Sequence, residues 1–308
     1  MIGHPAFLPL VPVLAVTLGL DRTVLAMGTQ LRIHLEGPGD PGPGSEAALR
    51  EVARIEVACS TWDPASPWSH LNEAGGRPVA LDGEWLDLLA EMQAWQVCTE
   101  GAFDPALGAL VKAWGIRQGG HRQPTALELE RARQASGSAL LVLDRKAGTA
   151  RFLDPQAALD EGGFLKGYAL DRMRAATAMP TGLLDFGGQL LAWGHPVEAA
   201  IADPLDRQRP RLTLLLKDAS LSCSGTSERG RHILDPRTGE PCPAWGSVAV
   251  VATEGLTADI LSTALYVLGP ERGLAWAERH GTAAAFLLND GTIRSSAAFR
   301  ALHPKELR

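Results

Sequence analysis

The sequence lacks the short motifs that identify several common enzyme classes. Its 308 residues include four cysteines and no CxxC pair, which argues against a zinc site and against a disulfide scaffold. There is no GxxxxGK(S/T) loop, which excludes a P-loop protein, and no GxSxG elbow, which disfavours an α/β-hydrolase. The double glycine in DFGGQLLAWG is not followed by the third glycine and the helix of a Rossmann fingerprint.

An excess of positive charge is also missing. The net charge is -6, the pI is about 5.8 and no run of basic residues occurs, which argues against a nucleic-acid-binding protein. Residues 6–20 are apolar, but no Lys or Arg precedes them, Pro9 and Pro12 interrupt them, and they contain no cysteine for a lipid anchor. We therefore expect residues 1–22 to form an apolar tail, with a weak signal or an overextended start site as alternatives. No later stretch is apolar enough to span a bilayer.

Hydrophobic spacing predicts a mixed α+β fold. Helical and strand-like segments alternate without a regular βαβ rhythm, and no linker divides residues 23–308 into independent domains. Ser45 is expected to cap a first helix, Pro105 to lie in the first turn of another, and Thr125 to cap a charged one. Further helices are expected over 84–98, from Lys166 to about Thr177, and over 256–269, and strands over 23–37, 139–144, 149–154, 182–186, 189–194, 211–225 and 246–252.

The stretch DEGGFLKGYALD, residues 160–171, places two glycines and one lysine at a predicted helix start. Glycine pairs let the backbone approach a ligand closely. A lysine at a helix N-terminus points toward an anionic partner in many proteins, since the helix dipole favours negative charge there. The residues alone leave two interpretations open, an exposed Lys166 at an ordinary turn or an anion site.

Two other segments carry candidate chemistry. In ADILSTAL, Asp259 and Thr263 are four residues apart on a predicted helix, so their oxygen atoms share a face and suit Mg²⁺. The alternative is an acid at a helix N-terminus with a packed threonine. In RHILDPRTG, His232 stands before a strong turn signal, as a surface histidine or as a group that exchanges protons or binds phosphate. Asp104, before Pro105, is expected to be an N-cap.

The order of these segments is more specific than any one of them. MGT, STWDPASPWSHLN, GAFDP, DEGGFLKGYALD, DFGGQLLAWG, CSGTSERG, HILDPRTG and TADILSTAL follow one another along residues 27–269. This series resembles the FAD:protein FMN transferase family, also called the ApbE family. The resemblance implies a single α+β domain of duplicated α/β modules, related to the T-fold. It also implies Mg²⁺-dependent transfer of FMN from FAD to a Thr or Ser hydroxyl of a target flavoprotein, with release of AMP.

The resemblance also assigns roles to residues. It implies Mg²⁺ ligands at Asp259, at Thr263 and at the carbonyl of Gly163, and it implies proton transfer or phosphate binding by His232, with Asp259 as a second candidate base. Trp62 stands where the family commonly has tyrosine, and its ring is expected to stack on the flavin or the adenine. The implied FAD contacts are Met27, Trp62, Ala102, Phe103, Asp104, Asp160, Lys166 and His232.

Some features depart from the family pattern or leave alternatives open. The segment between CSGT and HILDP is short, and Arg231 precedes His232 where relatives often have a second histidine. Asn72 lies where the family pattern separates transferases from FAD hydrolases. The alternatives are therefore a pyrophosphatase that yields FMN and AMP, or a non-catalytic FAD-binding protein. The family also implies an acceptor such as a membrane redox complex subunit and a place in the cell envelope or periplasm, with the cytoplasm as the alternative.

Overall fold

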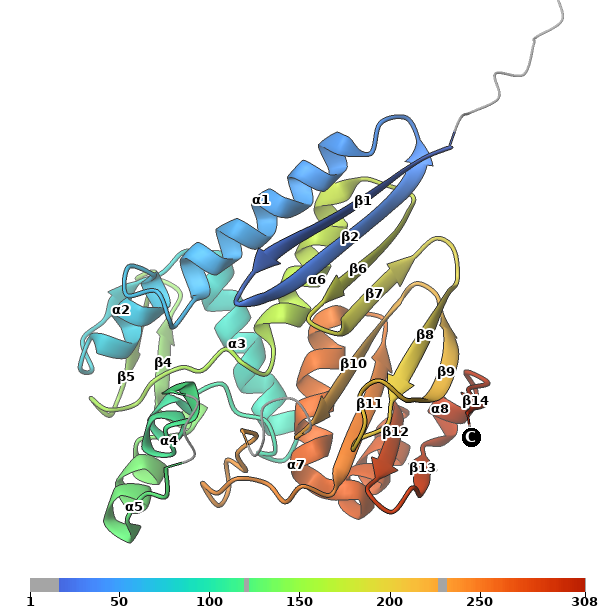
Figure 1. Cartoon of the computed structure of the whole chain (residues 1–308). Helices are drawn as coiled ribbons and strands as arrows, with labels where there is room; N and C mark the ends of the chain where they lie inside the picture. Colours follow the sequence, from blue (N-terminus) through green and yellow to red (C-terminus); the bar gives the residue numbers. More distant parts are fainter. Residues whose placement is uncertain (1–16, 119–121, 227–231, 308) are drawn as a thin grey trace, which may run out of the picture.

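The fold is built on an eight-stranded sheet in which every pair of neighbouring strands is antiparallel. The computed structural model describes residues 17–118, 122–226 and 232–307. The strand order is β1-β2-β6-β7-β10-β11-β12-β13, so β2 pairs with a strand far along the chain (Figure 1). The strands are β1 (Thr17–Ala26), β2 (Thr29–Pro38), β6 (Thr181–Phe186), β7 (Gln189–Trp193), β10 (Ala219–Gly225), β11 (Gly246–Ala252), β12 (Ala283–Leu288) and β13 (Ile293–Ser295).

Both faces of this sheet are buried in its C-terminal half, because alternate side chains of a strand point to opposite faces. In β11, Val248 and Val250 join the large core formed with the helices, whereas Ala249 joins a second core. The helices of the first core include α1 (Gly42–Cys59), α6 (Leu165–Thr177) and α7 (Gly255–His280). The second core lies under a small sheet of β8 (Val197–Ala202), β9 (Pro210–Leu216) and β14 (Lys305–Glu306), and under α8 (Ala297–Arg300).

A long excursion between α1 and α6 forms the remaining layer (Figure 1). Its α3 buries Trp85, Leu88, Leu89 and Met92, as its hydrophobic stripe predicts. Thr125 caps α5 in a capping box, as expected, and its side chain accepts from the Glu128 N–H. The elements are α2 (Pro67–Glu73), β3 (Val79–Ala80), α3 (Gly83–Cys98), α4 (Gly108–Ala113), η1 (Ile116–Gln118), α5 (Ala126–Gln134), η2 (Ser138–Leu140), β4 (Leu141–Asp144) and β5 (Thr149–Phe152).

Three element boundaries differ from those expected. Helix α1 begins at Gly42 after Pro41, so Ser45 is a buried residue of its first turns and not the N-cap. Helix α4 begins at Gly108, which leaves Pro105 in the preceding loop. Strand β1 begins at Thr17, so the last part of the expected tail pairs with β2. In these proline-rich and apolar segments the local signals are compatible with more than one element boundary. Contacts with the rest of the fold determine which boundary is formed.

The expected helix end at Gly269 is confirmed, because α7 consists of two helical segments that meet there at a kink. Gly269 has φ 76° and ψ 172°, and the helical path resumes at Pro270 and continues to His280. Glycine tolerates this backbone conformation, and proline is well suited to a first helical turn. Within residues 17–118, 122–226 and 232–307, we find no helix with the length and apolar character needed to cross a bilayer.

Candidate active site

A cavity of about 840 Å³ lies where the long excursion meets α6, α7 and the ends of β8 and β10. This volume lies in the upper part of the range that is typical of ligand-binding pockets. The cavity brings together segments that are remote in sequence, including almost all of the predicted site residues. Those that line it are Trp62, Ala102, Phe103, Asp104, Asp160, Gly163, Lys166, His232, Asp259 and Thr263.

Met27 is the predicted residue that does not line the cavity. It lies in the turn between β1 and β2 with a positive φ of 45°, and its N–H donates to Glu56 Oε1 at 3.0 Å. Thr29, two residues further on, does line the cavity. The turn is thus close to the site, although the described lining does not include the Met27 side chain.

Lys166 and Asp259 are brought together by a close crossing of α6 and α7. A Cβ on Gly167 would lie 2.3 Å from the carbonyl oxygen of Gly255, and one on Gly255 would lie 2.5 Å from that of Gly167. The two helices can therefore meet only because both positions are glycine. At this crossing Asp259 Oδ2 accepts from the Gly167 N–H at 3.0 Å and lies 3.8 Å from Lys166 Nζ.

The oxygen donors implied for Mg²⁺ fit a site that is completed by substrate. Asp259 is 4% exposed, and a Cβ on Gly163 would be 3.4 Å from Thr263 Oγ1, so the three implied ligands are neighbours at one end of the cavity. The described part of the chain contains no cluster of three His, Cys, Asp or Glu side chains that could hold a metal alone. Carboxylate, hydroxyl and carbonyl oxygens suit a hard cation that keeps positions for phosphate oxygens and water.

A chain of hydroxyl groups ties β10 to α7 beside these donors. Ser262 Oγ lies 3.1 Å from Ser222 Oγ and 2.9 Å from Ser224 Oγ, and it donates to the Asp259 carbonyl at 3.0 Å. Ser262 is fully buried, whereas Ser222 and Ser224 line the cavity. This arrangement fixes the position of the Asp259 turn of α7 relative to the sheet.

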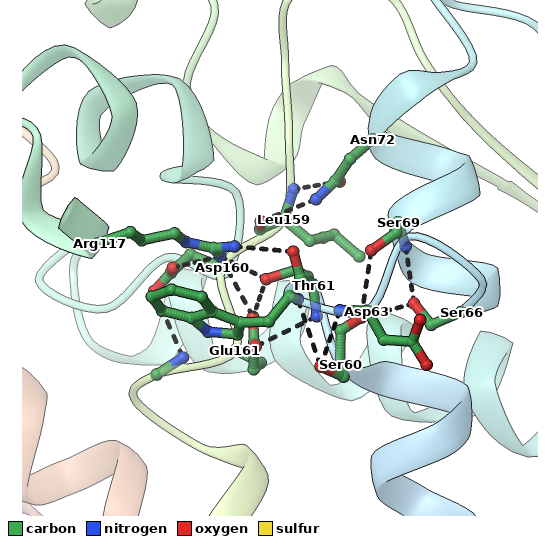
Figure 2. Close-up of polar contacts among 12 residues, drawn as sticks. Ser60, Thr61, Asp63, Ser66, Ser69, Asn72, Arg117, Leu159, Asp160 and Glu161 are labelled. Carbon is green, nitrogen blue, oxygen red and sulfur yellow. Dashed lines mark hydrogen bonds and ion pairs between the residues drawn. The ribbon is translucent and has the colours of Figure 1, made fainter. Parts of the chain in front are cut away.

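Another part of the cavity wall is a polar network centred on Arg117. Its guanidinium donates to Asp160 Oδ1 at 2.9 Å and to the Thr61 carbonyl at 2.8 Å, and it also bonds Thr61 Oγ1 (Figure 2). Glu161 Oε2 is 3.4 Å from the same guanidinium, and Glu161 accepts from the N–H and the hydroxyl of Thr61. Burial raises the pKa of the Glu161 carboxyl, and the adjacent Asp160 charge adds to this, while hydrogen bonds from Thr61 oppose it.

Asn72 fixes the strand-like segment that leads into this wall. Its Nδ2 donates to the Leu159 carbonyl at 3.1 Å, and its Oδ1 accepts from the Leu159 N–H at 2.7 Å (Figure 2). Both backbone groups of a fully buried residue are thereby satisfied by one amide. The Asn72 side chain thus fixes the backbone directly before Asp160 and Glu161.

Asp104 has a different role from the expected N-cap. It is 8% exposed, its Oδ1 accepts from the Ala106 N–H at 2.8 Å, and its Oδ2 accepts from the Ser138 N–H at 3.0 Å. Burial raises the pKa of this carboxyl, although the hydrogen bonds from Ser138 and Ala106 act against the rise. Asp104 therefore joins the loop before α4 to η2 at the edge of the cavity.

Known proteins with similar sequences and folds identify the family of this chain. The sequence pattern of the ApbE family matches residues 27–287. The chain belongs to the ApbE family. The "FAD:protein FMN transferase" of Treponema pallidum (strain Nichols) is 31% identical over 90% of this chain and 86% of its own length.

Solved structures of ApbE proteins confirm the fold. The flavinyl transferase ApbE of Pseudomonas stutzeri, in its apo form, has a TM-score of 0.82 at 28% identity and covers 93% of this chain and 97% of its own. The ApbE protein of Thermotoga maritima has a TM-score of 0.85 at 28% identity, with 92% and 99% of the two chains covered. The expected single mixed α/β domain is therefore the ApbE fold.

Within this family member, the His232 segment lies beside α4 and α5, because Leu234 packs with Leu110 and Trp114 in a small separate core. His232, Ile233 and Leu234 line the cavity together with Asp203 and Arg207 from the β8–β9 connection. Leu234 bridges to Pro241, and the DPRTG turn between them is formed as its sequence predicts. The short segment noted before it, including Arg231, lies outside the described residues.

Sequence reasoning missed the residues that surround Asp160. Thr61 and Arg117 show neither of the signals used to select the other residues, which are a glycine pair at a helix start and a pair of residues on one helix face. Glu161 stands inside the DEGG stretch but was not selected there. Arg117 stands in GIRQGGHRQPT, a glycine-containing stretch whose composition indicates only a loop, and its partners Thr61 and Asp160 are 56 and 43 residues away. No spacing in the sequence singles out Arg117. The adjacent acids Asp160 and Glu161 are the one local signal, because two neighbouring carboxylates favour a nearby cation.

Proposed function

We propose that this ApbE family protein transfers the FMN half of FAD onto a Thr or Ser hydroxyl of a target flavoprotein and releases AMP. The enzyme class is that of the relatives, which carry the name FAD:protein FMN transferase. The observation that carries the proposal is the α6–α7 crossing, which places Lys166 and Asp259 in a cavity of about 840 Å³ within the family fold. In the proposed step, the acceptor oxygen bonds to the FMN phosphorus as the bond to the AMP phosphate breaks, and the hydroxyl proton passes to a base.

The side chains of the cavity divide this work. Lys166, in the first turn of α6, lines the cavity, where its positive charge would offset that of the bound pyrophosphate. His232 and Asp259 are the candidate bases, since both line the cavity and an acceptor hydroxyl must lose a proton. Asp259, Thr263 and the Gly163 carbonyl would hold Mg²⁺, which supplies charge neutralisation at the pyrophosphate when bound.

A single reaction series tests the proposal. Purified protein is incubated with FAD, with and without Mg²⁺, and with and without an acceptor flavoprotein domain. AMP is followed by chromatography and the acceptor mass by intact-protein mass spectrometry. We expect a gain of one FMN on the acceptor and an equal amount of AMP only when all components are present.

Two variants distinguish the loss of a Mg²⁺ ligand from a general effect on folding. Asp259→Asn should abolish Mg²⁺-dependent AMP release, whereas Asp87→Asn, which removes the same charge from an exposed position on α3, should keep it. AMP with free FMN and no acceptor modification would support the hydrolase alternative. Bound FAD without AMP in any mixture would support the non-catalytic alternative. A membrane redox complex as the acceptor, and a location in the cell envelope, stay predictions.

A further inference from the structure

Arg117 joins two elements of the cavity wall, which Glu161 also connects by accepting hydrogen bonds from Thr61. Its guanidinium reaches Thr61 on the loop after α1 and Asp160 on the segment before α6, with N–O distances of 2.8 Å and 2.9 Å (Figure 2). The side chain is one quarter exposed, so water screens these contacts only in part. Charged, multiply hydrogen-bonded arginine is the strongest orienting group that a protein offers to carboxylates.

The same guanidinium lies over the ring of Trp62. The Arg117 Cζ atom is 4.8 Å from the ring centroid, which is a cation–π arrangement. Trp62 nevertheless stays 64% exposed, although it lines the cavity. One ring face is therefore covered by Arg117, and much of the remaining apolar surface is presented toward the cavity and solvent. An exposed indole next to a cavity is an unfavourable surface unless a ligand covers it.

The carboxylates of this wall would otherwise oppose an anionic ligand. Asp160 and Glu161 are adjacent in sequence, and Arg117 forms an ion pair with each of them. The pyrophosphate of FAD is negative, so uncompensated carboxylates in the wall would weaken its binding. Arg117 thus offsets part of this negative charge and fixes the direction of the carboxylates.

We propose that Arg117 is a positioning residue for FAD: it holds the Trp62 ring and the Asp160 carboxylate as one preformed wall on which an aromatic ring of FAD stacks. This inference rests on the proposed function for the identity of the ligand. Such a ring is planar and carries N–H groups that can donate hydrogen bonds to Asp160. Both the flavin and the adenine meet these two conditions. Arg117 itself acts through Trp62 and Asp160, and not on the reacting phosphate.

The chain contains a matched control for this arrangement. Arg54 makes the same two kinds of contact away from the cavity. It pairs with Glu84 at 2.8 Å and with Glu51 at 2.9 Å, and its Cζ lies 5.1 Å over the Trp85 ring. None of these residues lines the cavity. A purely structural contribution of such a cluster should therefore appear equally in Arg54→Ala and Arg117→Ala.

The test is FAD titration, followed by flavin fluorescence in EDTA so that no turnover occurs, with thermal unfolding measured for every variant. We expect Arg117→Ala to raise the Kd for FAD about tenfold and Arg54→Ala to leave it within about twofold, while both lower the Tm. Arg117→Lys keeps the charge but loses the planar fork, and its Kd should lie between those of the wild type and Arg117→Ala. In turnover, Arg117→Ala should raise KM for FAD and leave kcat nearly unchanged.

Two half-ligands identify the ring that stacks. FMN and ADP are titrated separately against the wild type and Arg117→Ala. A loss of affinity for only one of them supports the wall and assigns its ring to Trp62. Equal losses for both would overturn the proposal, because a general charge effect would explain them.

The remaining outcomes separate the two proposals. An unchanged Kd for FAD in Arg117→Ala would overturn the role of Arg117, and so would an equal rise in Arg54→Ala. A wild-type protein that binds FAD but transfers no FMN would refute the proposed function without affecting this result. A wild-type protein that binds FAD neither in EDTA nor in the presence of Mg²⁺ would refute both.

Discussion

Replacing Gly167 by alanine tests whether the crossing of α6 and α7 determines the geometry of the site. The added Cβ would lie 2.3 Å from the Gly255 carbonyl oxygen, 2.6 Å from its carbonyl carbon and 2.8 Å from Asp259 Cβ. A relaxed carbon–oxygen contact is about 3.3 Å. The two helices must therefore separate by roughly 1 Å, and the Gly167 N–H must move away from Asp259.

The expected effects follow from this displacement. Overpacking of a well-packed core costs about 1–3 kcal/mol in the free energy of unfolding. A shift of about 1 Å between groups that must act together can cost about 100-fold in rate. We therefore expect a lower Tm by thermal unfolding and a larger fractional loss of Mg²⁺-dependent AMP release from FAD, at a temperature where the variant is fully folded.

Gly273→Ala is the matched control, because it overpacks α7 away from the cavity. Its Cβ would lie 2.9 Å from both the Leu265 carbonyl oxygen and the Phe286 ring. It should lower the Tm and leave AMP release per folded molecule nearly unchanged. Full activity of Gly167→Ala at a reduced Tm would refute the reasoning, since the site would then tolerate a wider crossing.

Further predictions concern a surface ion pair, a backbone clamp and the lysine of the site. Arg54 lowers the pKa of Glu84, so this ion pair stabilises the fold above a pH of about 4.5 and loses its effect as the pH falls through the lowered pKa. Arg54→Ala should therefore cost about 1 kcal/mol in the free energy of unfolding at pH 7. A Tm difference from the wild type that did not narrow on acidification would contradict this. Asn72→Ala leaves the Leu159 N–H and carbonyl unpaired, which should cost about 2 kcal/mol in urea unfolding; an unchanged midpoint would show that water replaces the amide. Lys166→Ala should weaken FAD binding about tenfold in titration, and an unaltered Kd would remove Lys166 from the site.

Local rules predicted much of the fold because several helices and turns carry their signals in adjacent residues. The stripe of α3, the capping box at Thr125 and the Gly187–Gly188 turn between β6 and β7 are each determined within one or two turns of chain. The start of α1 was predicted wrongly, because Ser45 is a good capping residue whose burial against the rest of the fold overrides that preference. The strand order could not be predicted, since β2 pairs with β6 across the whole excursion.

The candidate site shows the same division. Asp259 and Thr263 share one helix face, and Lys166 stands at a helix start, so helical periodicity is enough to single them out. Their convergence depends on the glycine contact between α6 and α7, which no local pattern reveals. Arg117 was missed for the same reason, since its importance lies in partners from two distant loops.

The long-range pairing of the sheet has a consequence for how the protein is made. Gly167 and Asp259, which meet at the site, are 92 residues apart, and β2 finds its inner neighbour only when β6 exists. During vectorial synthesis on the ribosome, strands β1 and β2 must therefore persist without their sheet neighbour β6, with α1 packed beside them, until more than a hundred further residues have emerged. Such a high contact order favours slow, late folding. A nascent chain that ends before α7 lacks Asp259 and Thr263, so the cavity is complete only after α7 has emerged.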